Sequence, residues 1–104
     1  MDPAGVDGRR FSRCGLSVAI TPTPVVEAAT IRITLASAAM VRTNVYDVAG
    51  RSVGEIAPRY SVAGGYSIGW RPVTPDGRAL PSGVYFLRVS AGADLAIRRI
   101  LILR

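Results

Sequence analysis

The chain has 104 residues, of which 49% are hydrophobic, and its 13 basic and 7 acidic side chains give a net charge of +6. That length and hydrophobicity suit one small folded domain and exclude a wholly disordered chain. No apolar run approaches the roughly 20 residues that a transmembrane span needs. Because there is no histidine and the only cysteine is Cys14, the sequence also excludes a Ser-His-Asp triad, a His/Cys metal cluster and an intrachain disulfide.

Residues 1–15 mix Gly, Pro, Asp and Arg without any period, which predicts a flexible leader or linker before a folded domain at residues 16–104. Arg9-Arg10-Phe11 is similar to part of a twin-arginine export signal. The apolar stretch behind it has only seven residues and ends at Thr21-Pro22, so we expect no functional signal peptide. We expect Cys14 to be inert, and a redox or lipidation role is the alternative.

The positive charge lies mainly in the second half of the chain. All basic residues are arginine, and residues 51–104 carry eight of them against three acids, a net charge of +5. Such a basic half can meet nucleic acid, anionic lipid or an acidic partner. The alternative is an ordinary solvated surface in an arginine-rich composition, which is common in GC-rich genomes.

From Leu16 onward the sequence has the pattern of short strands. Apolar residues recur at every second position around Ile31 and Ile68, which is typical of half-buried strands. A weaker strand places Thr43 on its inner face, and Gly92-Ala93-Asp94 forms a hairpin turn between the last two strands. The expected strands cover residues 16–20, 30–36, 40–48, 51–57, 66–71, 83–91 and 94–103.

Turn residues separate these strands. Asp47 to Gly50 has Asp first and Gly fourth, as a type I turn favours, and Thr74 to Gly77 and Leu80 to Gly83 have Pro second and Gly fourth. Seven strands joined by such turns predict an all-β, seven-stranded antiparallel sandwich, with a small barrel as the alternative. We expect Trp70 to anchor the core rather than to hold a ligand, and Tyr85 to form a tyrosine corner.

The closing strand, at residues 94–103, is apolar on both faces near its end and has two interpretations. It is either a final core strand or a terminal segment that a partner binds by strand addition. Arg98, Arg99 and Arg104 bracket its apolar run and can act as gatekeepers against aggregation.

The sequence offers no chemistry that predicts an enzyme. Asp47 and Asp76 lie in turns where Asp is favoured for local backbone hydrogen bonds, and Ser82 has no histidine to activate it. Phosphate-binding glycine loops, clustered calcium ligands and recognition helices are absent from the sequence. We therefore expect no catalytic residue, no cofactor, no metal and no nucleic acid partner; nucleic acid binding, if present, would show as salt-sensitive association.

Five motifs follow one another along residues 20–104. The first is an apolar-Tyr-Asp-x-x-Gly-Arg turn with Tyr46, Asp47, Gly50 and Arg51, and the second is a short strand at 52–56. The third is a Gly-rich strand that ends in Trp70, and the fourth is an Asp-Gly turn at Asp76-Gly77 that leads to Ser-Gly-Val-Tyr-Phe at 82–86. The fifth is a basic residue before an apolar run at 99–103. In this order the chain resembles the C-terminal sorting domain of proteins exported by the type IX secretion system. It also resembles the related immunoglobulin-like domain of the flagellar hook-capping protein.

The resemblance implies an immunoglobulin-like fold and a sorting function without catalysis. Its recognition residues would be Gly83, Val84, Tyr85, Arg99, Ile100 and Ile102. The implied partners are the outer-membrane secretion machinery and a sortase-like peptidase that cleaves in the leader. The domain would be fused to a larger passenger, which reaches the cell surface or the medium through the periplasm as part of a precursor.

The alternative function is an immunoglobulin-like structural or protein-interaction module of an extracellular or hook-capping assembly. Arg99→Glu separates the two hypotheses, because it should impair export while sparing folding in a sorting signal and should do little in a structural module.

Overall fold

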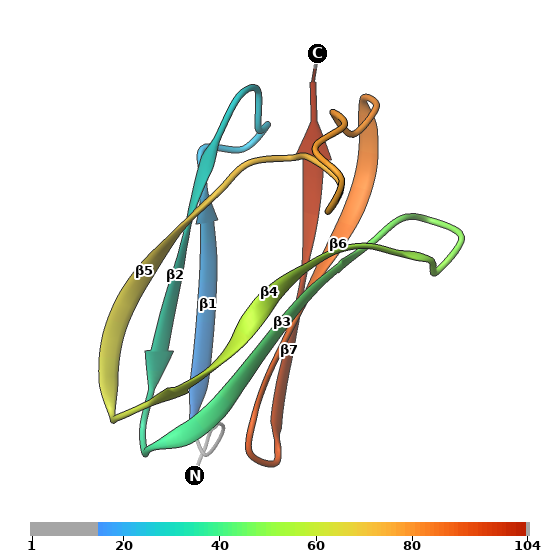
Figure 1. Ribbon diagram of the computed structural model, residues 1–104. Helices are drawn as coiled ribbons and strands as arrows, with labels where there is room; N and C mark the ends of the chain where they lie inside the picture. Colours follow the sequence, from blue (N-terminus) through green and yellow to red (C-terminus); the bar gives the residue numbers. More distant parts are fainter. Residues whose placement is uncertain (1–14, 104) are drawn as a thin grey trace, which may run out of the picture.

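The computed structural model describes residues 15–103, which form an all-β domain of two antiparallel sheets (Figure 1). The sheets have the strand orders β1-β2-β5 and β4-β3-β6-β7. The strands are β1(Leu16–Thr21), β2(Ala29–Leu35), β3(Ala39–Tyr46), β4(Ser52–Ser61), β5(Gly64–Trp70), β6(Gly83–Ala91) and β7(Asp94–Ile102). The predicted seven-stranded sandwich is therefore confirmed, and the barrel alternative is wrong. The expected leader, including Cys14, lies outside the described residues except for Gly15.

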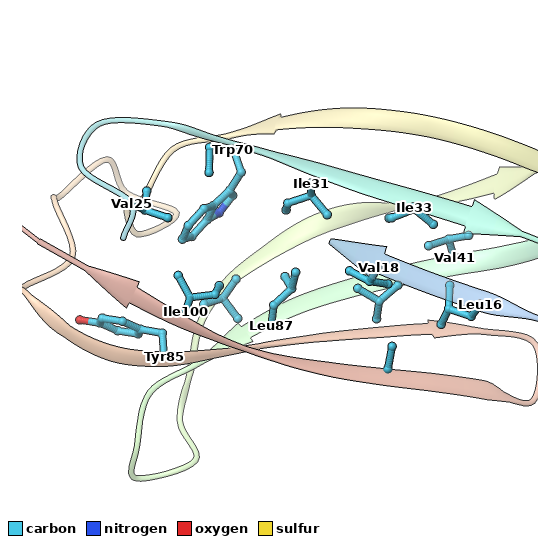
Figure 2. Packing of buried hydrophobic residues seen from close by; sticks show 14 of the residues in the cluster. Leu16, Val18, Val25, Ile31, Ile33, Val41, Trp70, Tyr85, Leu87 and Ile100 are labelled. Carbon is cyan, nitrogen blue, oxygen red and sulfur yellow. The ribbon is translucent and has the colours of Figure 1, made fainter. Parts of the chain in front are cut away.

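Within residues 15–103 no helix is long and apolar enough to cross a membrane. The strands form because their apolar residues alternate, so that each sheet buries one face against the other. In β2 every second residue is buried, from Ala29 to Leu35, and β6 buries Tyr85, Leu87 and Val89 in the same manner. Figure 2 shows Ile31 and Ile33 of β2 meeting Leu87 of β6 between the sheets. Trp70 is 8% exposed and belongs to this core, as predicted.

Three strand boundaries differ from the prediction by two residues or more. β3 ends at Tyr46, because Val48 belongs to the following turn and is exposed. β4 continues to Ser61 although Pro58 interrupts its pattern. β4 is an edge strand, and its register against β3 shifts between Val41 and Thr43, so an irregularity accommodates a residue that cannot donate a backbone hydrogen bond. β5 begins two residues early, at Gly64, because glycines show no alternation.

Two core residues come from segments that the sequence indicated were only connections. Val25, between β1 and β2, is fully buried and pairs in parallel with Ile102. Its N–H donates to the Leu101 carbonyl at 2.7 Å, and its own carbonyl accepts from the Leu103 N–H at 2.9 Å. Leu80, in the β5–β6 connection, is 2% exposed, and its N–H donates to the Pro72 carbonyl at 2.9 Å. Both segments close one end of the sandwich.

Arg98 joins the open edges of the two sheets. β1 and β7 are the edge strands on the same side of the sandwich and contact each other. The Arg98 Nε donates to the Val18 carbonyl of β1 at 3.0 Å, and its Nη1 donates to the Ile97 carbonyl of β7 at 3.0 Å. The guanidinium thus occupies carbonyl groups at which another strand could pair, which agrees with the gatekeeper role predicted for this arginine.

Tyr85 forms the predicted tyrosine corner. Its hydroxyl donates to the Pro81 carbonyl at 2.8 Å and ties the start of β6 to the preceding turn. Figure 2 shows the hydroxyl pointing away from the core while the ring lies within it.

Tyr85→Phe is expected to lower the free energy of unfolding by about 0.5–1.5 kcal/mol, because it removes this partly buried hydrogen bond and keeps the ring. Urea unfolding followed by the fluorescence of Trp70 measures the change. Tyr60→Phe is the control, since Tyr60 is 65% exposed and its loss should be close to zero. Equal effects of the two substitutions would show that the corner contributes nothing.

Candidate functional site

The turn between β3 and β4 gathers four of the predicted motif residues. The Gly50 N–H donates to the Asp47 carbonyl at 3.0 Å, and Gly50 has a φ of +84°, which glycine adopts at little cost. The Asp47 carboxylate accepts from the backbone N–H groups of Ala49 and Arg51 and from Arg51 Nε, each at 2.9 Å. Tyr46 lies half-buried at the end of β3. Asp47 and Arg51 therefore form an ion pair with each other, and the Asp47 carboxylate also stabilises the turn.

The Asp-Gly turn before β6 is built on the same principle. The Gly77 N–H donates to the Thr74 carbonyl at 2.8 Å, and Gly77 has a φ of +91°. The Thr74 hydroxyl donates to the Asp76 carboxylate, which also pairs with Arg78 at 3.3 Å. The two turns line one open hollow of about 370 Å³ together with Tyr85.

Both turn carboxylates have a lowered pKa. The hydrogen bond from the Arg51 backbone is the largest cause for Asp47, and the hydrogen bond from the Thr74 side chain is the largest for Asp76. In each case the partners favour the charged form. These carboxylates are thus held ionised for turn structure, which is the structural use that the sequence predicted for them.

Acid should weaken both turns together. Because folding lowers the pKa of Asp47 and Asp76, their contribution to stability is complete above the ordinary value of 3.8 and is lost as the pH falls through the lowered folded values. Urea midpoints measured from pH 6 to pH 2 should therefore fall less for Asp47→Asn/Asp76→Asn than for the unmodified chain, and the two curves should converge at the acid end. Parallel curves of urea midpoint against pH would contradict the conclusion that these two ionised carboxylates stabilise the turns.

Four of the six predicted recognition residues belong to the interior or to the backbone frame of the β6–β7 hairpin. Ile100 and Ile102 are fully buried, and Tyr85 is 6% exposed. Gly83 opens β6 with a φ of +153°, a conformation that side-chain-bearing residues rarely adopt. We call these four residues the framework positions, because none of them offers a long side chain to a partner.

The other two, Val84 and Arg99, point outward on neighbouring strands. Phe86 of β6 lies opposite Arg99 of β7, so Val84, two residues before Phe86, is a diagonal neighbour of Arg99. Val84 is 36% exposed, and Arg99 is exposed. We call the side of the four-stranded sheet that faces away from β1, β2 and β5 the outer face, and both residues belong to it.

The structure also bears on the two interpretations of the closing strand. β7 pairs with β6 along its full length and contributes Ile100 and Ile102 to the core. Its other edge pairs with Val25 at Leu101 and Leu103. A partner strand could not add at this end of β7 without displacing Val25, so the core interpretation describes β7, and the outer face is the surface that it presents.

Sequence reasoning missed Val25 and Leu80 in the core and the use of Arg98 between the sheets. For Arg98 a signal existed, since position 98 shares the inward alternation of 96, 100 and 102. Within residues 15–103, no group of three or more His, Cys, Asp and Glu residues is placed to hold a metal ion.

Comparison with known proteins gives a family and a fold. The family model described as the FlgD Ig-like domain matches residues 17–94. A comparison with curated proteins gave no match.

Among the solved structures that match this chain are two proteins of one bacterium. One is dimeric latent PorU from Porphyromonas gingivalis, with a TM-score of 0.70 and 23% identity over 85% of this chain and 9% of that chain. The other is PorZ of the same organism, described as an essential bacterial surface component of the type-IX secretion system, with a TM-score of 0.57 and 22% identity over 84% of this chain and 11% of that chain. This chain thus spans about a tenth of each protein, and the likeness is one of fold.

Proposed function

Because the chain belongs to the family of FlgD Ig-like domains, we propose that it acts by binding other proteins, as a non-catalytic C-terminal sorting module. In this role it directs an attached passenger through the type IX secretion system to the cell surface. The similarity in fold to domains of PorU and of PorZ, a surface component of that system, supports the proposal. The partners would be the outer-membrane secretion machinery and a sortase-like peptidase. The domain would reach them from the periplasm, as part of a larger precursor.

The observation that carries the proposal is that the β6–β7 hairpin has two kinds of predicted recognition residue, buried or restricted ones and outward-facing ones. The framework positions are buried or conformationally restricted, and they hold Val84 and Arg99 side by side on the outer face. A folded signal needs an outward surface on a rigid frame, because rigidity lowers the entropy cost of binding. The turn carboxylates of Asp47 and Asp76 are occupied by local hydrogen bonds, which supports a role without catalysis.

A second candidate function rests on the same family match. The domain would be an immunoglobulin-like structural or interaction module in an extracellular or hook-capping assembly. The function of such a module would depend on its fold, but it would not depend on the type IX secretion system.

A secretion assay distinguishes the two. A signal peptide and a fluorescent passenger are fused to residues 1–104 and expressed in a bacterium with a type IX system and in its secretion-deficient mutant. The sorting proposal predicts passenger outside the cell only in the first strain and only with the domain attached. A passenger that remains in the periplasm of both strains, while circular dichroism shows the domain folded, would reject sorting and favour the structural module.

A further inference from the structure

The outer face of the four-stranded sheet differs from the opposite surface of the sandwich. On the three-stranded sheet the outward positions are small or polar, as at Ser17, Thr30 and Ser67. On the outer face, six large hydrophobic side chains are at least one-third exposed: Met40, Tyr60, Val84, Leu95, Ile97 and Leu101. Solvated sheet faces are normally polar. The six side chains lie as three pairs, Met40 with Tyr60, Val84 with Leu101, and Leu95 with Ile97, and exposed apolar area gathered on one face is typical of interaction surfaces.

Three arginines cross this face. Arg99 lies on β7, Arg88 on β6 and Arg42 on β3, and all three are exposed. Arg88 lies opposite Ile97, so it is a diagonal neighbour of Arg99. Arg42 lies opposite Ser90, so it is a diagonal neighbour of Arg88 as well. The three side chains form one row across three strands, which we call the arginine row.

The arginine row has no partner of its own. Within residues 15–103, neither an ion pair nor a side-chain hydrogen bond involves Arg42, Arg88 or Arg99. Arginines elsewhere do interact: Arg51 with Asp47, Arg78 with Asp76, Arg98 with Val18, and Arg59 with the ring of Tyr66 at 4.3 Å. Among the strands of this sheet, the one acid with an outward position is Glu55, which lies opposite Asn44 and is thus a diagonal neighbour of Arg42, but no ion pair joins Glu55 and Arg42. The row therefore presents three guanidinium groups whose donors are unused.

The spacing of the row matches an extended acidic segment. Diagonal neighbours in a sheet lie about 7–8 Å apart. Alternate residues of a strand point to the same side and lie about 6.7 Å apart, at 3.3–3.4 Å per residue. Carboxylates at every second position of an extended peptide can thus meet successive arginines, and guanidinium–carboxylate pairs are the strongest side-chain hydrogen bonds.

We propose that the outer face binds an acidic protein segment in an extended conformation, with carboxylates at alternate positions on Arg42, Arg88 and Arg99. Apolar side chains border the row along its length, with Val84 and Leu101 beyond Arg99 on one side, Ile97 opposite Arg88, and Met40 beyond Arg42 on the other side. Five of the six exposed hydrophobic side chains on this face are not aromatic, and Tyr60 is the exception, so the face suits a protein partner better than single-stranded nucleic acid, which is bound by stacking on several aromatic rings. This inference deepens the proposed function, because it names the chemistry of the partner that the sorting module would recognise.

Synthetic peptides test the proposal on the full chain. The probe is a fluorescein-labelled peptide of alternating Thr and Glu. One control has Gln in place of Glu, and a second has the same composition but with all glutamates in one block. We expect saturable binding by anisotropy for the alternating peptide, at least about fivefold weaker binding for the block peptide, and none for the Gln peptide. Equal affinity for alternating and block peptides would overturn the proposal, because it is what simple attraction to a chain of net charge +6 produces.

Matched variants locate the site. Arg42→Ser/Arg88→Ser/Arg99→Ser should weaken binding by at least about tenfold, since charged hydrogen bonds are lost. Arg32→Ser/Arg71→Ser/Arg78→Ser removes the same charge elsewhere and should change binding by less than about threefold. If the first variant does not fold, the alternating peptide is titrated into the unmodified chain and the amide chemical shifts are followed by NMR. Shift changes confined to β3, β6 and β7 support the proposal, and changes elsewhere overturn it.

Two further probes test the class of partner. Tighter binding of phosphatidylserine vesicles or of an oligo-dT strand than of the alternating peptide, on the same face, would replace the acidic segment with a membrane or nucleic acid. These measurements need no secretion machinery. Peptide binding without domain-dependent export would therefore reject the sorting function alone, and export without peptide binding would reject the acidic segment alone.

Discussion

Replacing Ile100 with alanine is expected to lower the free energy of unfolding by about 2–5 kcal/mol, because a large aliphatic side chain is lost from a close-packed core. Ile100 is fully buried in the second half of β7, opposite Tyr85 of β6, and Figure 2 shows it among the core side chains between the sheets. Urea unfolding followed by circular dichroism measures the loss. A domain of this size has little more stability than that to spare.

Leu101→Ala is the matched control for this prediction. Leu101 is the next residue of the same strand and has a side chain of the same size, but it lies on the outer face and is 40% exposed. Its replacement is expected to cost less than about 1 kcal/mol, since less apolar area leaves water when it folds. Similar losses for both variants would show that β7 is not buried on one side as described.

Trp70→Ala is expected to lower the free energy of unfolding by about 3–5 kcal/mol, the range for a large aromatic side chain removed from a core. Trp70 ends β5 opposite Ala29, and Figure 2 shows its indole beside Val25 at the end of the sandwich. The cavity would thus lie where the β1–β2 connection is held. Thermal unfolding followed by circular dichroism is the measurement, because the variant has no tryptophan.

Trp70→Phe separates the contribution of aromatic packing from any specific requirement for the indole at this position. It keeps an aromatic ring and should recover more than half of the loss. If Trp70 served as an exposed ligand platform, both variants would retain nearly full stability. That outcome would contradict its assignment to the core.

Much of the fold could be predicted because its strands obey a simple alternation. Residues around Ile31 alternate between a buried and an exposed face, so one strand could be located from spacing alone. The turns at Asp47 and Asp76 could be predicted because Asp and Gly occupy positions that the backbone conformation favours. The tyrosine corner at Tyr85 followed from its place after a Gly-containing turn.

The remainder depends on contacts between distant segments, which local patterns do not encode. Val25 is buried because it pairs with Ile102, far along the chain. β4 passes Pro58 because it is an edge strand, and the position of an edge follows from strand order. The arginine row exists only through the registers of β3, β6 and β7. Ile100 and Ile102, by contrast, lie on the side of the sheet opposite Arg99 through strand alternation alone, although the resemblance groups all three as recognition residues.

The most direct test of the account is the fraction of passenger outside the cell for three fusions: the unmodified domain, Arg99→Glu and Arg32→Glu. Both substitutions change the charge equally and lie on exposed strand positions, one on the outer face and one on the opposite sheet. We predict that Arg99→Glu reduces export strongly while Arg32→Glu does not, with both domains folded by circular dichroism. Equal export of all three fusions would contradict the claim that the outer face carries the signal.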